Sequence, residues 1–196
     1  MTPKRLILAS ASPRRSQLLS QAGFIFDVVH SDADETLPDG LPPAEAAVEV
    51  ARRKALAVAG GIRSAVILAA DTIVVAPGGK VLGKPDDEAD ARRMLRELSD
   101  STHVVITGVF AVDCDTARTI GHAVATTVVF GKMTDAEIDA YVAGGEALGK
   151  AGAYAIQESG DRFVRRIEGC FTNVVGLPME TVTEMLTGFG ITPAPA

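Results

Sequence analysis

Residues 66–75 read VILAADTIVV, an apolar run that is interrupted only by Asp71 and its neighbour Thr72. Strands that are buried on both faces of a parallel sheet have such nearly continuous apolar sequences. A carboxylate in that setting is costly to desolvate unless a cation or ligand binds it. We therefore predict a buried strand with a functional carboxylate. The alternative is an aspartate that caps a turn at a strand end.

The composition is that of a globular protein. The chain has 196 residues, of which 47% are hydrophobic, enough for one large domain or two small lobes. The formal net charge of −6 argues against a broad nucleic-acid surface, which would need clustered Lys and Arg. A small anionic ligand in a local basic pocket is compatible with this charge.

Several features favour a soluble cytoplasmic protein. The two cysteines, Cys114 and Cys170, are far apart in the sequence and have no metal-binding spacing. The N-terminus lacks the apolar core and cleavage site of a signal peptide. The sequence has no apolar run of the ~18 residues that a membrane-spanning helix needs. We expect no membrane partner.

The N-terminal region predicts an anion site. A strand over residues 5–9 leads through a serine-rich turn, with Ser10 and Ser12, into a helix that begins near Pro13. Ser12 suits the N-cap and Pro13 the first helical position. The backbone N–H groups of a helix N-terminus attract anions, and phosphate is the natural guest.

Arg14 and Arg15 follow in the first turn of this helix, where a positive charge opposes the helix dipole. This placement favours a function for the guanidinium groups, because arginine binds phosphate in bidentate fashion. The alternative is an ordinary amphipathic helix with solvated arginines. We take Ser10, Ser12, Arg14 and Arg15 as candidate substrate-binding residues.

An acidic cluster, SDADE at residues 31–35, ends at Glu35. Its carboxylates suit a divalent cation, held directly or through water, although the spacing is not that of an EF-hand. A solvated acidic loop is the other interpretation, and the local sequence favours neither.

Two lysines are candidate ligands for Asp71 or for phosphate. Lys54 lies beside the apolar stripe of a predicted helix over residues 43–59, so its side chain either passes the edge of the core or projects into a cleft. Lys84 stands between Gly83 and Pro85, at the end of the returning arm of a predicted hairpin.

The rest of the chain predicts a mixed α/β sheet that is curved or split into two lobes with a cleft. We expect helices over residues 86–98, 134–143 and 179–186, strands over 102–112, 118–132 and 163–168, and a loop over 173–178. Thr134 and Glu137 are spaced as a capping box. We expect one domain over residues 1–196, with a frayed C-terminal tail from about residue 188.

Two other sequence patterns do not predict sites. Gly144 to Ala151 and Gly78 to Pro85 nearly match a P-loop, but both lack the Ser or Thr that reaches Mg²⁺. The three histidines, His30, His103 and His122, have no metal-ligand spacing.

Six motifs, in the right order, resemble the Maf family of nucleoside triphosphate pyrophosphatases. They are LASASPRR at 8–15, ADT at 70–72, LGKP at 82–85, TGV at 107–109, KAGAYAIQ at 150–157 and NVVGLP at 173–178. The resemblance covers residues 6 to about 186. It implies a mixed, curved sheet flanked by helices, with two lobes around a central cleft, as in the inosine triphosphate pyrophosphatases. It also implies hydrolysis of a nucleoside triphosphate to the monophosphate and pyrophosphate, with Mg²⁺ or another divalent cation such as Mn²⁺.

The resemblance also implies roles for individual residues. Asp71 matches the general base of the family and a metal ligand, and Glu35 matches an acidic residue that we assign to the metal. The family's phosphate-side cations are matched by Arg14, Arg15, Lys54 and Lys84. We take Asp71, Lys54 and Lys84 as the candidate catalytic residues.

The resemblance points to the branch that acts on dTTP and UTP, because Arg14, Thr72 and Gln157 match positions linked to that preference. An amide suits a pyrimidine edge, since it both donates and accepts hydrogen bonds. The sequence departs from the family pattern at Glu158, which is usually Gly, and at residues 170–171, Cys-Phe in place of Ser-Tyr.

Three alternatives stay open. The same chemistry on 7-methyl-GTP or inosine triphosphate is one, and a nucleotide-binding regulator of cell division with little turnover is another. The third is a structural protein that holds a peptide. A homodimer is what the family resemblance implies.

Overall fold

The computed structural model describes residues 4–194. Within them, seven strands form one sheet. The strands are β1 (Arg5–Ala9), β2 (Asp27–Val29), β3 (Ala65–Val75), β4 (Val81–Leu82), β5 (Thr102–Asp113), β6 (Thr119–Phe130) and β7 (Val164–Glu168). The helices are α1 (Pro13–Gln21), α2 (Pro43–Ala59), α3 (Glu88–Leu98), α4 (Asp135–Ala143), α5 (Phe171–Val175) and α6 (Met179–Gly188). Short 3-10 turns are η1 (Pro77–Gly79), η2 (Ala151–Ala153) and η3 (Ser159–Phe163).

The strand order is β2-β1-β3-β5-β6-β7, with β4 paired to β3. β1 pairs in parallel with β2 and β3, whereas the β3–β4 and β6–β7 pairs are antiparallel. The predicted fold class, a mixed α/β sheet flanked by helices, is confirmed.

The chain divides into two compact units. Unit 1 comprises the chain up to Asp71, Thr107–Val124 and the chain from Gly176; unit 2 comprises Thr72–Ile106 and Ala125–Val175. β3, β5 and β6 each contribute residues to both units.

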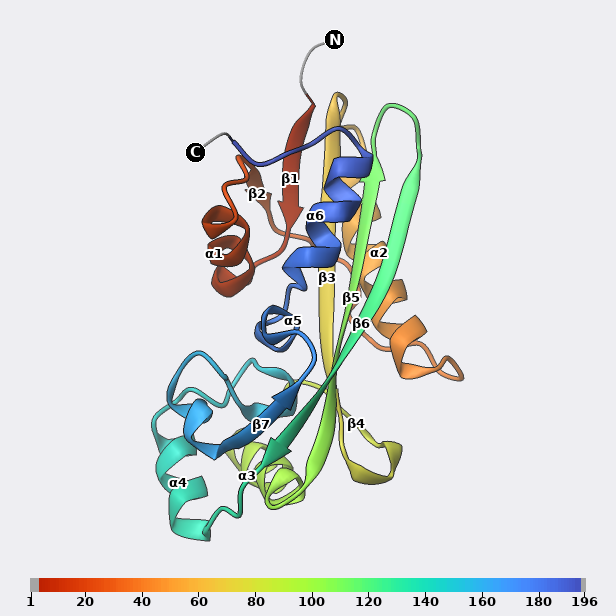
Figure 1. Cartoon of the computed structure of the whole chain (residues 1–196). Helices are drawn as coiled ribbons and strands as arrows, with labels where there is room; N and C mark the ends of the chain where they lie inside the picture. The colour runs from red at the N-terminus through yellow and green to blue at the C-terminus, as the bar shows by residue number, and fades with distance from the viewer. Residues whose placement is uncertain (1–3, 195–196) are drawn as a thin grey trace. The chain divides into compact units, whose positions relative to one another are not determined.

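Unit 1 is built on two helical crossover connections, which parallel strands require. α1 connects β1 to β2, and α2 connects β2 to β3 (Figure 1). α2 and α6 lie on opposite sides of the strands, as Figure 1 shows. Because helices cover both faces, β3 is buried from Ala65 to Ala70, as its apolar sequence predicts.

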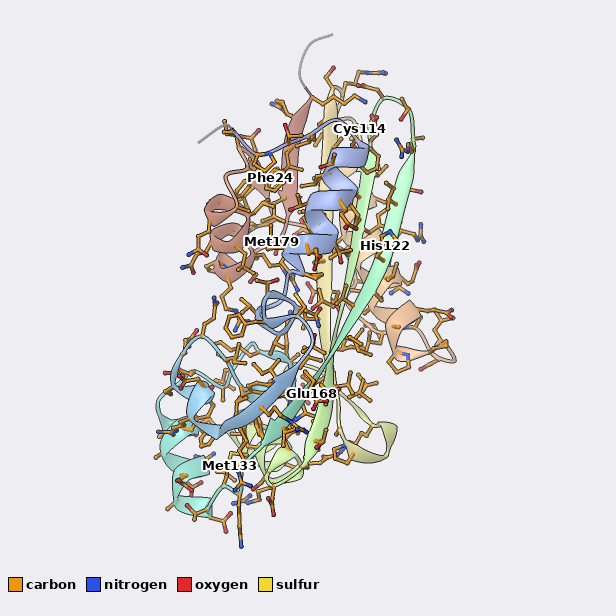
Figure 2. The ribbon with its side chains drawn as sticks, viewed as in Figure 1. Phe24, Cys114, His122, Met133, Glu168 and Met179 are labelled. Carbon is orange, nitrogen blue, oxygen red and sulfur yellow. The ribbon has the colours of Figure 1, made fainter. Side chains whose placement is uncertain are left out.

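The core on the α2 side is made of small and branched side chains. It contains Ile7, Ala9, Ala51, Ala55, Val58, Ala65, Ile67, Ala69, Phe110 and Val112. Cys114, just after β5, packs against this cluster (Figure 2). Gly108 of β5 permits the closest approach, because a Cβ atom there would lie 2.3 Å from the carbonyl carbon of Ala47 in α2. The small side chains of these alanines and this glycine allow α2 to pack closely on the sheet.

Unit 2 contains an aromatic cluster and two well-capped helices. The Asp87 carboxylate accepts a hydrogen bond from the Asp90 N–H at the start of α3. α4 begins with the predicted capping box of Thr134 and Glu137. α4 therefore begins where its sequence signal indicates, and α3 begins two residues after the predicted position 86.

The structure differs from the sequence prediction at two elements. Residues 171–175 form α5, which overlaps the predicted loop over 173–178 at residues 173–175. The buried Asn173 side chain donates to the Val105 carbonyl at 3.0 Å, a tertiary contact that no local signal predicts. The apolar sequence at residues 24–29 favours a longer strand than β2, which spans only Asp27–Val29.

The segment after α6, which we expected to fray, makes contacts in unit 1. Phe189 and Ile191 are buried. The Ala194 N–H donates to the Gly23 carbonyl at 2.8 Å. Among residues 4–194, the helices are all too short or too polar to span a bilayer.

Candidate active site

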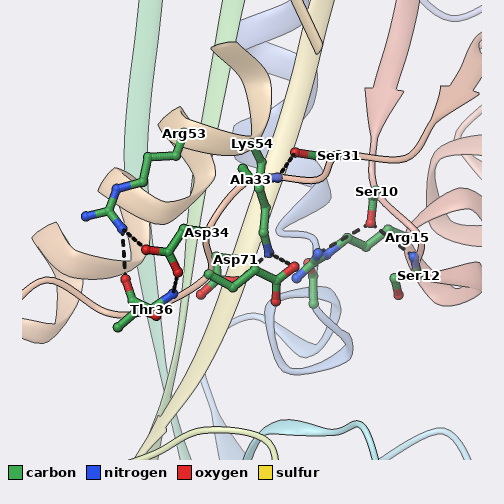
Figure 3. A network of polar contacts seen from close by, with 12 residues as sticks. Ser10, Ser12, Arg15, Ser31, Ala33, Asp34, Thr36, Arg53, Lys54 and Asp71 are labelled. Atoms are coloured by element: carbon green, nitrogen blue, oxygen red, sulfur yellow. Dashed lines mark hydrogen bonds and ion pairs between the residues drawn. The ribbon is translucent and has the colours of Figure 1, made fainter. Parts of the chain in front are cut away.

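A lysine between two carboxylates forms the centre of the site in unit 1. The Lys54 ammonium lies 2.7 Å from Asp71 Oδ1 and 3.0 Å from Glu35 Oε1 (Figure 3). Lys54 is 6% exposed. Its charge is therefore compensated inside the protein, as burial of an ammonium group requires.

Tertiary structure decides the question that the sequence leaves open at Lys54. The apolar face of α2 packs on the sheet, and Lys54 extends from the edge of that face toward Asp71 on β3. Asp71 and Thr72 are partly exposed and lie within β3 between the buried residues 65–70 and the buried residues 73–74. The carboxylate is therefore held by a buried cation and still has access to solvent.

Arg15 adds a second cation to this group. Its Nε donates to the Gly176 carbonyl at 2.8 Å, and its Nη1 lies 3.4 Å from Ser10 Oγ. Figure 3 shows the Arg15 guanidinium directed toward Asp71. Desolvation lowers the pKa of Arg15, while the charges of Asp71 and Glu35 act in the opposite direction.

The contact with Gly176 was not predictable from the sequence, because 161 positions separate the two residues. Only the fold brings the turn before α6 beside the N-terminus of α1.

The serine turn between β1 and α1 has the predicted form. Ser10 is buried, and its hydroxyl accepts a hydrogen bond from the Ser12 N–H at 3.1 Å. Ser12 is the N-cap of α1 and Pro13 its first residue, although the Ser12 side chain makes no capping hydrogen bond. Arg14 follows in the first turn and is partly exposed. The first-turn N–H groups and Arg14 remain positioned for an anion.

The acidic loop that carries Glu35 is ordered by its own polar side chains. Ser31 Oγ accepts from the Ala33 N–H at 3.2 Å, and Asp34 Oδ1 accepts from the Thr36 N–H at 2.9 Å. Hydrogen bonds from Thr36 lower the pKa of Asp34.

Arg53 is a residue that the sequence interpretation missed. Its Nη1 donates to the Thr36 carbonyl at 2.8 Å (Figure 3). Its Nε donates to Glu49 at 3.2 Å. Arg53 thus ties the loop of Glu35 to the helix of Lys54. Its neighbouring position to Lys54 is the only sequence signal for this role.

The structure brings together five predicted site residues within unit 1, namely Ser10, Arg15, Glu35, Lys54 and Asp71. Three others belong to unit 2. Thr72 follows Asp71 in β3. Lys84 follows Gly83, whose carbonyl accepts from the Gly152 N–H at 3.0 Å. Gln157 is exposed in a turn after η2.

Among residues 4–194, no group of three or more His, Cys, Asp or Glu side chains is placed so that it could hold a metal ion. Glu35 and Asp71 supply the carboxylate oxygens that hard cations prefer, and both contact the Lys54 ammonium. A Mg²⁺ ion commonly takes one or two protein carboxylates and completes its shell with waters and substrate phosphates. The donor set of Glu35 and Asp71 fits such an ion.

Comparison with known proteins gives consistent results. A family model described as Maf-like protein matches residues 5–189. A dTTP/UTP pyrophosphatase of Pelotomaculum thermopropionicum is 46% identical over 187 residues, 95% of this chain and 97% of that protein.

Two further relatives named dTTP/UTP pyrophosphatase are similar over nearly their whole lengths. The one from Anaeromyxobacter dehalogenans is 51% identical and covers 95% of this chain and 94% of its own. The one from Geobacter sulfurreducens is 50% identical and covers 97% of this chain and 99% of its own. The matched regions include every candidate residue described above.

Proposed function

This chain belongs to the Maf family, and from that membership we propose that it hydrolyses dTTP and UTP to the nucleoside monophosphate and pyrophosphate. The relatives that carry this activity in their names match almost the whole chain. The structural observation that best supports the proposal is the pair of Lys54 and Asp71 at 2.7 Å, with Arg15 directed toward the same carboxylate.

We assign Asp71 as the general base. Its carboxylate accepts a proton from a water molecule as the water oxygen attacks the α-phosphorus of the substrate. The bond between the α-phosphorus and the bridging oxygen breaks, and pyrophosphate leaves with the bonding electrons. Lys54 holds the Asp71 carboxylate in one orientation, which general-base catalysis requires.

The remaining cations stabilise negative charge on the phosphates. Arg14 and Arg15 lie in the first turn of α1, where backbone N–H groups add to their effect. We assign Lys84 to the same task. Charge stabilisation of this kind is a large term in phosphoryl transfer.

We propose that Glu35 and Asp71 hold Mg²⁺, or Mn²⁺ in its place. When bound, such an ion neutralises charge on the phosphate oxygens and orients the attacking water. Ser10 and Ser12 would bind the phosphates, while Thr72, Gln157 and Arg14 would select the pyrimidine. We also propose a homodimer in the cytoplasm, which light scattering and cell fractionation can test.

The experiment is a measurement of pyrophosphate release from dTTP, UTP, CTP, 7-methyl-GTP and inosine triphosphate, with Mg²⁺, with Mn²⁺ and with chelator. We expect metal-dependent release from dTTP and UTP. Release from a purine nucleotide alone would support the same hydrolytic chemistry but contradict the assignment of pyrimidine nucleotides as substrates. Tight binding without any release would make the protein a nucleotide-binding regulator.

The assignment of Asp71 as the general base is tested with Asp71→Asn, which removes the proton acceptor and keeps the shape of the side chain. We expect kcat to fall by about a hundredfold or more, since general-base catalysis contributes about that factor. Asp39→Asn is the matched control, because Asp39 is an exposed carboxylate of the same unit. Equal activities of the two variants would refute the role of Asp71.

A further inference from the structure

The segment that precedes Gln157 is buried up to the position before it. Gly152 to Ile156 are all buried, whereas residues 157–159 are exposed. A turn in which the Glu158 N–H donates to the Ala155 carbonyl at 3.4 Å brings Gln157 to the surface of unit 2. The position of the Gln157 amide therefore depends on how Tyr154 and Ala155 are held.

Ala155 is held from two sides. Its N–H donates to Tyr141 Oη, from α4, at 3.0 Å. Gly160 lies against its carbonyl, because a Cβ atom at Gly160 would be 2.5 Å from the Ala155 oxygen. These contacts leave the backbone at Ala155 little freedom to move.

Tyr154 is held by a buried histidine. His103, at the start of β5, places its Nε2 2.8 Å from Tyr154 Oη, and His103 and Tyr154 are 1% and 5% exposed. Phe130, at the end of β6, makes edge contacts with both rings, with centroids at 4.7 and 4.8 Å. The Tyr154 ring is thus enclosed, and its hydroxyl has a specific partner.

A buried imidazole ring at position 103 has a desolvation cost, and packing alone does not explain why a polar ring is used here. His103 Nδ1 is buried and makes no hydrogen bond with any part of the chain that the structure describes. A phenylalanine would fill the same space without this cost. Burial also lowers the pKa of His103 to about 4, so the ring is neutral at pH 7. The bond to Tyr154 is the interaction that a histidine, and not a phenylalanine, can make here.

We propose that His103 and Tyr154 are positioning residues that determine substrate specificity, acting through Gln157. Their hydrogen bond holds the segment over residues 152–156 in register, and this places the Gln157 amide opposite the edge of a uracil or thymine base. The inference rests on the proposed function, since it supposes that Gln157 contacts the base. It assigns His103 and Tyr154 no part in the hydrolytic step.

The test begins with Tyr154→Phe, which removes the hydroxyl and keeps the ring. We measure kcat and KM for UTP and CTP, which differ at the base edge that an amide can distinguish. The ratio of kcat/KM for UTP over CTP should fall about tenfold, the scale of a misaligned hydrogen bond in a binding pocket. The loss should appear in the KM for UTP, while kcat stays within about twofold because no reacting group is touched.

Thr126→Val is the matched control, because it also removes a buried hydroxyl from unit 2, one that bonds to Asn173 and Cys170. It should leave the UTP/CTP ratio unchanged. A similar fall in both variants would show that general loosening of unit 2 is the cause, and would overturn the proposal.

A double-mutant cycle with Gln157→Ala tests whether the effect passes through Gln157. In that background Tyr154→Phe should change the ratio no further; an undiminished effect would refute the proposal. Should Tyr154→Phe fail to fold, His103→Phe breaks the same bond from the other side and must give the same result. Failure of the proposed function is a distinct outcome: in that case the wild-type protein itself would release no pyrophosphate from UTP.

Discussion

At the scale of single residues, the candidate active site is defined by compensated charge. Lys54 and Asp71 have side chains that are 7% and 13% exposed, and each compensates the charge of the other. Glu35, at 43%, remains open to solvent and is the carboxylate better placed to gain a further partner. The site therefore contains a fixed pair of charges and a more adaptable third charge.

Lys54→Met should weaken both stability and activity. The variant leaves the Asp71 carboxylate without its ammonium partner, and breaking a buried pair costs about 2 kcal/mol or more. Urea unfolding measures the loss, and kcat for UTP should fall because the base is no longer oriented.

Lys80→Met is the control for this variant. It breaks the Lys80–Glu97 pair, in which the Lys80 side chain is 54% exposed, and such surface pairs contribute about 0–1 kcal/mol. Equal losses of stability in the two variants would contradict the buried character of the Lys54–Asp71 pair.

Asp113, at the end of β5, provides a pH-dependent contribution to stability. Burial acts to raise its pKa, but hydrogen bonds from Lys4, Asp115 and Thr116 outweigh burial and lower the pKa to about 2 from 3.8. A carboxyl group with a lowered folded-state pKa stabilises the protein above its unfolded-state pKa. That stabilisation is lost as pH falls from about 4 to about 2.

Asp113→Asn should therefore lower the free energy of unfolding at pH 7 by about 2 kcal/mol, because the pKa of this carboxyl is about 2 in the folded protein against an ordinary 3.8. The difference in unfolding free energy between wild type and variant should shrink as the pH falls from 4 toward 2. Urea titrations at pH 7, 4 and 3 measure it. A difference that stays constant over this range would show that the carboxylate charge is not the source of the stability.

At the scale of elements, α2 is the helix on which the site depends. Its alanines allow close packing on the sheet, and its edge carries Lys54 to Asp71 and Arg53 to the acidic loop. The distance between α2 and β5 is set at Gly108, where the two backbones nearly touch. A change in that distance would move Lys54 relative to β3.

Gly108→Ala tests this dependence. Its Cβ atom would lie 2.3 Å from the Ala47 carbonyl carbon, so α2 must shift as a unit. Overpacking of this kind costs about 1–3 kcal/mol. We expect a lower melting temperature and, because Lys54 moves with the helix, a lower kcat.

Gly60→Ala is the control for Gly108→Ala, since a Cβ atom at Gly60, just after α2, would have open space around it. It should change stability by less than about 0.5 kcal/mol. Unaltered stability and kcat in Gly108→Ala would show that α2 tolerates displacement.

At the scale of the whole molecule, the net charge of −6 and the anionic substrate are reconciled by local arrangement. Cations that are distant in the sequence gather around Asp71 in unit 1, while much of the negative charge lies elsewhere. On α3, for example, Arg92, Arg93 and Arg96 pair with acidic residues of α3 and α4. The overall charge thus argues against a broad nucleic-acid surface and is compatible with a local phosphate site.

The sequence alone determined much of this protein. The apolar run around Asp71 predicts the central strand, and the Ser12-Pro13 and Thr134–Glu137 signals predict the starts of α1 and α4. These features are local, because burial on both faces and helix capping each leave a pattern within a few residues. The six motifs likewise predicted the family that the comparisons confirm.

Tertiary structure decided what local patterns do not encode. Several contacts join residues that are distant in the chain. They are the bonds from Arg15 to Gly176, from Lys54 to Asp71 and from Arg53 to Thr36 in the acidic loop, and the contact of the segment after α6 with Gly23. α5 and the bond from His103 to Tyr154 belong to the same class. Such contacts depend on which elements the sheet order brings together, and neither propensity nor periodicity carries that information.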